Sequence, residues 1–216
     1  MRKYDYVLFD LDGTLTDPGE GITNSVAYVL EKFGIPVPPR QELYKFIGPP
    51  LSDSFVEYFN FSREDAEKSV YIYREYFDRK GIFENVVLPG AEACLKKLNE
   101  LGYTVMLATS KPEVAAKRIL DKFNLSRYFH YVCGADLAGV LKHKEDVIRY
   151  AFSTAGITDP TRAIMIGDRK HDVIGARING MDCIGVTFGY GSREELFSAG
   201  AAFIADDFDS VINYII

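Results

Sequence analysis

The chain has 216 residues, of which 47% are hydrophobic and 26% charged, and its formal net charge is −6 at pH 7. This composition supports a sizeable core and argues against global disorder. The negative charge argues against non-specific binding to nucleic-acid polymers or anionic membranes, because both require a positive field. The length fits one domain with an insertion, or one large and one small domain.

The cysteines and the N-terminal residues indicate the cellular location of the protein. Cys94, Cys133 and Cys183 are far apart and in no CxxC spacing, which favours buried side chains in a reducing cytosol over disulfides or a zinc site. The chain enters its first apolar run without the apolar segment of a signal peptide, and no run approaches the roughly 20 residues that span a bilayer. We therefore expect a cytoplasmic protein without a membrane partner. We also expect a monomer or a weak homodimer.

Short apolar runs bounded by turn residues predict strands that are buried on both faces. They lie at residues 6–9, 104–108, 131–133, 163–166 and 183–186. Amphipathic patterns predict helices at residues 90–101, 112–123, 144–155, 173–179 and 193–199. This alternation predicts an α/β fold, a doubly wound parallel sheet with right-handed crossovers.

One long segment lacks a convincing strand pattern. Between residues 17 and 87 the sequence shows helical patterns at 21–33, 40–46, 51–59 and 62–79, and Ser62 with Asp65 resembles a capping pair. We therefore expect a catalytic core of residues 1–15 and 88–216, and an all-helical unit of residues 16–87. This unit is either a structural appendage or a lid, because it begins where ligand sites occur in open α/β sheets.

Two carboxylates, Asp10 and Asp12, follow the first predicted strand directly, and Gly13 and Thr14 come next. Turn or cap formation explains such acids in many proteins, so the motif alone is weak evidence. In the functional interpretation both acids project into a crevice, where they repel each other unless a divalent cation is bound. Magnesium prefers such hard oxygen ligands, and Gly13 allows a sharp turn.

Another group of polar residues follows the strand predicted at 104–108. Thr109 and Ser110 lie between this strand and the helix predicted from Pro112. A hydroxyl and free backbone N–H groups at a helix start bind phosphate. A simple helix cap by either residue is the alternative.

Two further groups precede predicted helices. Lys144 lies near a helix start, where a cation interacts unfavourably with the helix dipole, so it is a candidate anion ligand. Lys142 is a competing candidate for this role. The alternative is that Lys144 is a solvated surface lysine. Asp168 and Asp172 follow the strand predicted at 163–166 and are four residues apart, so they could share one face of a starting helix. Because the carboxyl ends of parallel strands meet at one sheet edge, the four groups together predict a metal-assisted site for an anion.

These motifs give the chain its resemblance to a known family. Asp10–Thr14 (DLDGT), Thr109–Ser110, Lys144 and Gly167–Asp172 (GDRKHD) match, in order, the four motifs of haloacid dehalogenase-like (HAD) hydrolases. The helical insertion resembles the cap of the phosphoglycolate phosphatase-like branch. FIGPPL, YREYF, ATSKPE, IGDRKHD and FGYGSREEL are similar to a subgroup described as 5′-nucleotidases or broad phosphatases. LAGVLKH at 137–143 departs from that subgroup, which often has a more polar stretch there.

The resemblance implies a magnesium-dependent phosphomonoester phosphatase. Asp10 would be the nucleophile that forms an aspartyl-phosphate, and Asp12 the general acid and base. Thr109, Ser110 and Lys144 would hold the phosphoryl oxygens. The Mg²⁺ ligands would be the Asp10 carboxylate, the Asp12 backbone carbonyl and Asp168, with Asp172 as a further ligand or as a support for bound water. The substrate would be a small phosphorylated metabolite or nucleotide.

The superfamily also contains enzymes with other activities. The dehalogenases of the superfamily lack an acid at the position of Asp12 and use no metal, so Asp12 and Asp168 favour phosphoryl chemistry. A phosphomutase uses the same four motifs, and a phospho-aspartate switch protein that does not turn over is a further alternative. We expect the cap to select the substrate, with Lys45, Gly48 and Arg74 as candidate contacts.

Overall fold

The computed structural model describes residues 2–137, 140–141 and 143–216. Its main sheet has six parallel strands, and β1 lies in the interior of the sheet. In spatial order the strands are β5 (Tyr131–Ala135), β4 (Thr104–Pro112), β1 (Tyr6–Phe9), β6 (Ala163–Gly167), β7 (Asp182–Val186) and β8 (Phe203–Ala205). A separate two-stranded sheet contains β2 (Thr16–Asp17) and β3 (Val86–Val87).

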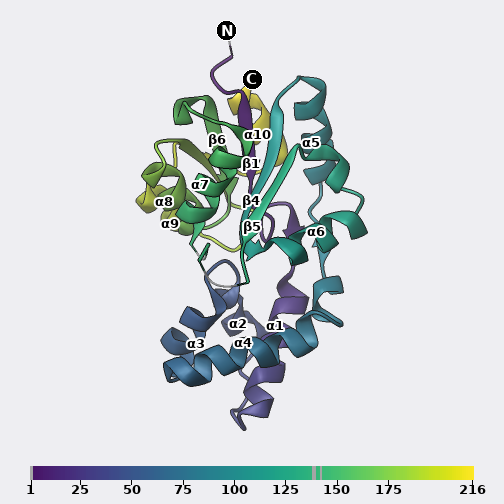
Figure 1. The fold of residues 1–216 in the computed structure, drawn as a ribbon, viewed down its shortest axis with the longest axis vertical. Helices are drawn as coiled ribbons and strands as arrows, with labels where there is room; N and C mark the ends of the chain where they lie inside the picture. Colours follow the sequence, from purple (N-terminus) through teal and green to yellow (C-terminus); the bar gives the residue numbers. More distant parts are fainter. Residues whose placement is uncertain (1, 138–139, 142) are drawn as a thin grey trace. The chain divides into compact units, whose positions relative to one another are not determined.

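Helices cover both faces of the six-stranded sheet (Figure 1). One face carries α7 (Lys144–Ala155), α8 (Lys170–Ile178) and α9 (Arg193–Ala199). The other carries α5 (Ala91–Glu100), α6 (Glu113–Lys122) and α10 (Phe208–Ile215). Two 3₁₀ turns, η3 (Ser126–Tyr128) and η4 (Pro160–Arg162), lie before β5 and β6. This arrangement confirms the predicted fold class.

Burial explains why the predicted strands form. Val7, Leu8 and Phe9 of β1 are fully buried, as are Ile164, Met165 and Ile166 of β6, because an interior parallel strand contacts helices on both faces. On the α7–α8 side, Leu8 and Met165 pack in one cluster with Val147 of α7. The apolar strand runs therefore form the centre of the core.

The structure extends one predicted strand and contains further elements that were not predicted. β4 continues to Pro112 instead of ending at Ala108, so α6 begins one residue later than predicted. The strands β2 and β3 lie at the ends of the segment expected to be all-helical, residues 16–87, and are absent from the prediction, as are the helix α10 and the strand β8. The strand has three residues at a sheet edge and is only partly buried, which leaves a weak pattern.

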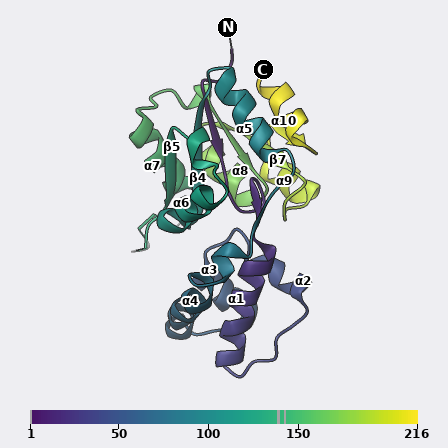
Figure 2. The same cartoon turned by 90° about the vertical axis from the view of Figure 1, so that its right-hand side faces the viewer.

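The second compact unit comprises Asp17–Val86, and the first Met1–Thr16 with Val87–Ile216. Figure 2 shows the helices of the second unit, in which α1 packs against α4 and α4 against α3. Its helical elements are α1 (Gly19–Lys32), α2 (Arg40–Leu43), η1 (Tyr44–Phe46), α3 (Leu51–Phe59), α4 (Arg63–Phe77) and η2 (Gly81–Phe83). The Ser62 hydroxyl accepts a hydrogen bond from the Asp65 N–H at 3.0 Å, as the capping pair predicts.

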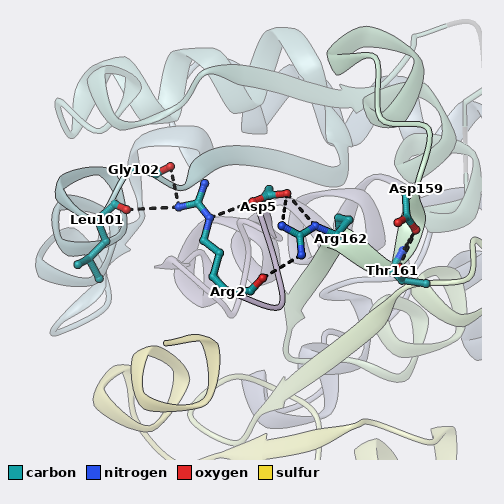
Figure 3. Close-up of polar contacts among 7 residues, drawn as sticks. All are labelled: Arg2, Asp5, Leu101, Gly102, Asp159, Thr161 and Arg162. Atoms are coloured by element: carbon teal, nitrogen blue, oxygen red, sulfur yellow. Dashed lines mark hydrogen bonds and ion pairs between the residues drawn. The ribbon is translucent and has the colours of Figure 1, made fainter.

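At the amino end of the sheet, one carboxylate joins the segments that lead into β1 and β6 (Figure 3). Asp5 accepts hydrogen bonds from Arg2 Nε at 2.9 Å and Arg162 Nε at 2.8 Å. Arg2 also donates to the carbonyls of Leu101 and Gly102, which precede β4. This network lies at the strand ends opposite to the predicted acids and is therefore structural.

Candidate active site

The predicted acids lie at the point where the chain changes direction across the sheet. From β1 the chain adds β4 and then β5 on one side, and later adds β6, β7 and β8 on the other. Open α/β sheets bind ligands beyond the carboxyl ends of the strands at this switch point. Asp10 follows β1, and Asp168 follows β6. The Asp10 N–H donates to the Ile166 carbonyl at 2.9 Å, so the fold brings the two acidic segments together.

Gly13 makes close packing of these segments possible. Its φ is +79°, and a Cβ at this position would lie 2.2 Å from Asp168 Oδ2. The next residue, Thr14, donates from its hydroxyl to Asp168 Oδ1 at 3.2 Å. The turn therefore needs glycine for both conformation and space.

Asp10, Asp168 and Asp172 form a buried cluster in which one carboxylate oxygen from each lies within 4.8 Å of the others. Burial, followed by repulsion from Asp172 and Asp10, raises the pKa of Asp168 well above its ordinary value. Burial also raises the pKa of Asp172, to about 6. Such crowding of hard oxygen ligands fits a divalent cation, which would compensate their charge.

Lys144 is the basic residue inside this cluster. Its side chain is only 3% exposed, and its ammonium lies 2.9 Å from Asp10 Oδ1 and 2.8 Å from Asp172 Oδ1. It also donates to the Ala108 carbonyl at 3.0 Å. Burial lowers the pKa of Lys144, but the two carboxylates outweigh this effect and raise it overall. Lys144 is therefore no solvated surface lysine; the competing candidate Lys142 lies outside the described residues.

Thr109 and Ser110 do not cap a helix, contrary to the alternative interpretation. Both lie in the extended part of β4, whose pairing with β5 shifts register between Thr109 and Pro112. The Thr109 side chain is buried, and its hydroxyl accepts a hydrogen bond from the Lys111 N–H at 3.2 Å. The expected helix-start geometry is wrong because Pro112 is extended and α6 begins only at Glu113.

The two carboxylate oxygens of Asp12 have different surroundings. Lys111 Nζ forms an ion pair with Oδ2. Oδ1 is buried and has no hydrogen-bond partner among the residues that the structure describes. Burial raises the pKa of Asp12, and Lys111 opposes this shift. The sequence shows Lys111 only as part of ATSKPE, so its contact with Asp12 was not predicted.

A loop after β7 also contributes to the site. The Tyr190 N–H donates to Asp168 Oδ2 at 2.8 Å. Gly189 approaches so closely that a Cβ there would lie 2.4 Å from the Asp168 Cβ. The paired glycines of FGYGS signal a tight backbone approach, but they do not indicate which residue is approached.

The candidate substrate contacts belong to the helical unit. Lys45 places its ammonium 4.5 Å from the ring centroid of Tyr58, within cation–π range. Gly48 has a φ of +108°. Arg74 lies in the last turn of α4. Within this unit, therefore, Lys45 contacts an aromatic ring, Gly48 has a left-handed backbone conformation and Arg74 lies near a helix end.

Comparisons with known proteins agree with this geometry. A family model described as haloacid dehalogenase-like hydrolase matches residues 7–186. A crystal structure described as a predicted phosphatase from Clostridium acetobutylicum has a TM-score of 0.96 and 52% sequence identity, with 98% of each chain covered.

Two curated relatives differ in the activity that their names state. A 5′-nucleotidase from Pseudomonas aeruginosa is 44% identical over 90% of this chain and 87% of that protein. Tyrosine-protein kinase PtkA from Mycobacterium tuberculosis is 36% identical over 87% of this chain, but the match spans only 64% of that protein. The chain belongs to the haloacid dehalogenase-like hydrolases, and its similarities place it among the phosphatases of that family.

Proposed function

We propose that the protein is a magnesium-dependent phosphomonoester phosphatase that works through an aspartyl-phosphate. The observation that supports this most strongly is the buried cluster of Asp10, Asp168 and Asp172 around Lys144. It combines a nucleophile, hard oxygen ligands and a cation for the phosphoryl group at the switch point of the sheet.

In the proposed reaction, an Asp10 oxygen bonds to phosphorus as the bond to the leaving alcohol breaks. The Asp12 carboxyl gives its proton to the leaving oxygen. The Asp12 carboxylate then takes a proton from a water molecule whose oxygen bonds to phosphorus, and the bond to Asp10 breaks. Phosphate leaves, and both aspartates return to their starting states.

The acids are suited to hold magnesium. Its ligands would be the carboxylates of Asp10 and Asp168 and the backbone carbonyl of Asp12, with Asp172 as a ligand or as a hydrogen-bond partner of bound water. The bound ion would supply positive charge against the phosphoryl oxygens. The raised pKa values of Asp168 and Asp172 support this proposal, because they express the cost of burying these carboxylates together.

Three residues would hold the phosphoryl oxygens. Lys144 offers an ammonium, Thr109 a hydroxyl and Ser110 a backbone N–H group. Lys144 and Thr109 are buried, and charged or polar donors act strongly in a water-poor site. These interactions would stabilise the charge on the equatorial oxygens during transfer.

The proposed substrate is a small phosphorylated metabolite or a nucleotide. The relative named 5′-nucleotidase supports the nucleotide. Residues 16–87 would act as the cap, with Lys45, Gly48 and Arg74 as substrate contacts. Cys94, Cys133 and Cys183 are buried and free, which supports a cytoplasmic location. In the described part of the chain, every helix is too short or too polar to cross a bilayer.

Transfer from the aspartyl-phosphate to an acceptor other than water is the second candidate. A phosphomutase would pass the group to another hydroxyl of its substrate, and the relative named tyrosine-protein kinase motivates a test with a protein tyrosine. A switch protein would keep the phosphoryl group. The final acceptor of the phosphoryl group therefore distinguishes these functions.

The test is phosphate release from an aryl phosphate by the wild type and Asp10→Asn, each with Mg²⁺ and with chelator. We expect release only by the wild type with Mg²⁺. Nucleotides, phosphoglycolate and sugar phosphates then define the substrate range. Equal release by Asp10→Asn would contradict the role of Asp10. A phosphoryl group that stays on the protein, or that moves to another hydroxyl, would favour the alternatives.

A further inference from the structure

A buried ion pair joins Lys111 to Asp12, the proposed general acid, and gives the two carboxylate oxygens of Asp12 different surroundings. The side chain of Lys111 is 6% exposed and that of Asp12 is 12% exposed. A lysine is rarely buried without a specific partner, because its charge loses hydration. Here the ammonium contacts Asp12 Oδ2, whereas Oδ1 is buried with no hydrogen-bond partner among the described residues.

The backbone around Lys111 fixes the origin of this side chain. Lys111 lies in the extended end of β4, and its N–H donates to the Thr109 hydroxyl at 3.2 Å. The register shift between Thr109 and Pro112 interrupts regular pairing with β5 at this position. The lysine therefore extends from an anchored strand segment, and both partners of the ion pair belong to the same compact unit.

We propose that Lys111 is a positioning residue that orients Asp12 for proton transfer to the leaving group. By occupying Oδ2, the ammonium leaves Oδ1 as the oxygen that carries the proton. The carboxyl group is then held in one rotamer, and proton transfer depends steeply on such alignment. This inference rests on the proposed phosphatase function and adds a residue to which that proposal gives no role.

A positioning role and a phosphate-binding role predict different kinetics. A residue that binds the phosphoryl group affects every phosphate ester alike. A residue that acts through the general acid matters most when the leaving alcohol is weakly acidic, since a good leaving group departs with little help from a proton. The dependence of the rate on the leaving group therefore distinguishes the two roles.

The experiment compares the wild type, Lys111→Met and Lys111→Arg on phenyl phosphates whose ring substituents range from nitro to methoxy. We expect kcat/KM of Lys111→Met to fall about 10²-fold for the poorest leaving group and less than about tenfold for the nitro ester. Lys111→Arg should recover part of this loss, because it restores the cation. Lys117→Met is the matched control, since Lys117 is 53% exposed and pairs with Glu113 on the surface of α6; it should match the wild type.

Two further measurements separate positioning from other roles. In an Asp12→Asn background, Lys111→Met should produce no additional dependence on the leaving group, because the group it orients is gone. Orthovanadate should bind Lys111→Met as tightly as the wild type. Circular dichroism and thermal unfolding establish that each variant is folded, and Lys111→Arg provides the test if the methionine variant is not.

Several outcomes would overturn the inference. Equal losses for all esters, or a weaker affinity for orthovanadate, would make Lys111 a phosphate ligand or a structural residue. A leaving-group effect that persists in Asp12→Asn would show that Lys111 does not act through Asp12. A wild type that hydrolyses none of the esters would remove the proposed function, whereas an active wild type with an unaffected Lys111→Met would remove only this inference.

Discussion

At the scale of single residues, the site depends on close approaches that the sequence indicates only in part. The motifs predict Asp10, Asp12, Asp168 and Asp172 because acids after buried strands are unusual and fall at one sheet edge. They do not predict Lys111, because no local pattern shows that its side chain reaches back to the turn after β1. The same holds for Tyr190, which contributes only its backbone N–H.

Gly13 gives the sharpest residue-scale prediction. Gly13→Ala should lower activity about 10²-fold, because the new methyl group displaces Asp168. It should also destabilise the fold by more than the roughly 1–2 kcal/mol that a left-handed conformation costs alanine. Gly156→Ala is the control: its φ is +68°, and a Cβ there meets nothing within 4 Å.

The comparison uses phosphate release at saturating Mg²⁺ and denaturant unfolding of both variants. Gly156→Ala should lose stability by about 1 kcal/mol and keep full activity. Identical behaviour of the two variants would contradict the account, since it would mean that the contact with Asp168 has no consequence.

At the scale of elements, apolar runs and amphipathic periodicity locate many of the helices and strands. The predicted ranges of β1, α3, α7 and α9 agree with the structure. The prediction fails where tertiary contacts decide the element. β4 extends through Thr109–Pro112 although its apolar run ends earlier, and β8 forms at the edge by pairing with β7. The order of the strands could not be predicted, because a right-handed crossover can place the next strand further along on either side.

The cap of α9 can be tested with a matched pair of serines. The Ser192 hydroxyl accepts a hydrogen bond from the Glu195 N–H at 3.0 Å, whereas Ser198 is exposed near the other end of the helix. Ser192→Ala should therefore lower the free energy of unfolding by about 1 kcal/mol. Ser198→Ala should leave it unchanged or raise it slightly, because alanine favours helices. Equal losses in urea unfolding would show that the cap does not stabilise α9.

At the scale of the whole molecule, the candidate site lies at the carboxyl ends of the parallel strands, and the Asp5 network lies at their amino ends. The four motifs, in order, predict the position of the candidate site, because the carboxyl ends of parallel strands meet at one sheet edge. The polar network around Asp5 could not be predicted, since it connects Arg2 and Asp5 with residues about a hundred or more positions away, and these segments meet only in the folded sheet. Its contribution should appear in stability and not in catalysis.

The Asp5 network predicts a pH-dependent difference in stability. Hydrogen bonds from Arg162 and Arg2 lower the pKa of Asp5 below its ordinary value. A carboxylate with a lowered folded-state pKa stabilises the fold above its unfolded pKa, near about 4, and loses this effect as the pH falls through the folded pKa. Asp5→Asn should therefore be less stable than the wild type at neutral pH, and the difference should shrink below about pH 4.

Urea unfolding at a series of pH values measures this difference. Glu31→Gln, which removes an exposed acid from α1, controls for the change in net charge. Stability curves of wild type and Asp5→Asn that stay parallel to the lowest pH would contradict the assigned role. Phosphate release by Asp5→Asn should match that of the wild type under conditions where both are folded.

In the proposed mechanism, Asp10 carries the phosphoryl group during turnover. The most direct measurement uses Asp12→Asn with nitrophenyl phosphate and Mg²⁺, followed by intact-protein mass spectrometry and borohydride reduction. A good leaving group needs little proton donation, whereas hydrolysis of the intermediate needs a base, so the phosphorylated protein should accumulate. We expect one added phosphoryl group and conversion of residue 10 to homoserine. A phosphoryl group on another residue, or nitrophenol release by a wild type in which Asp10 is never modified, would contradict it.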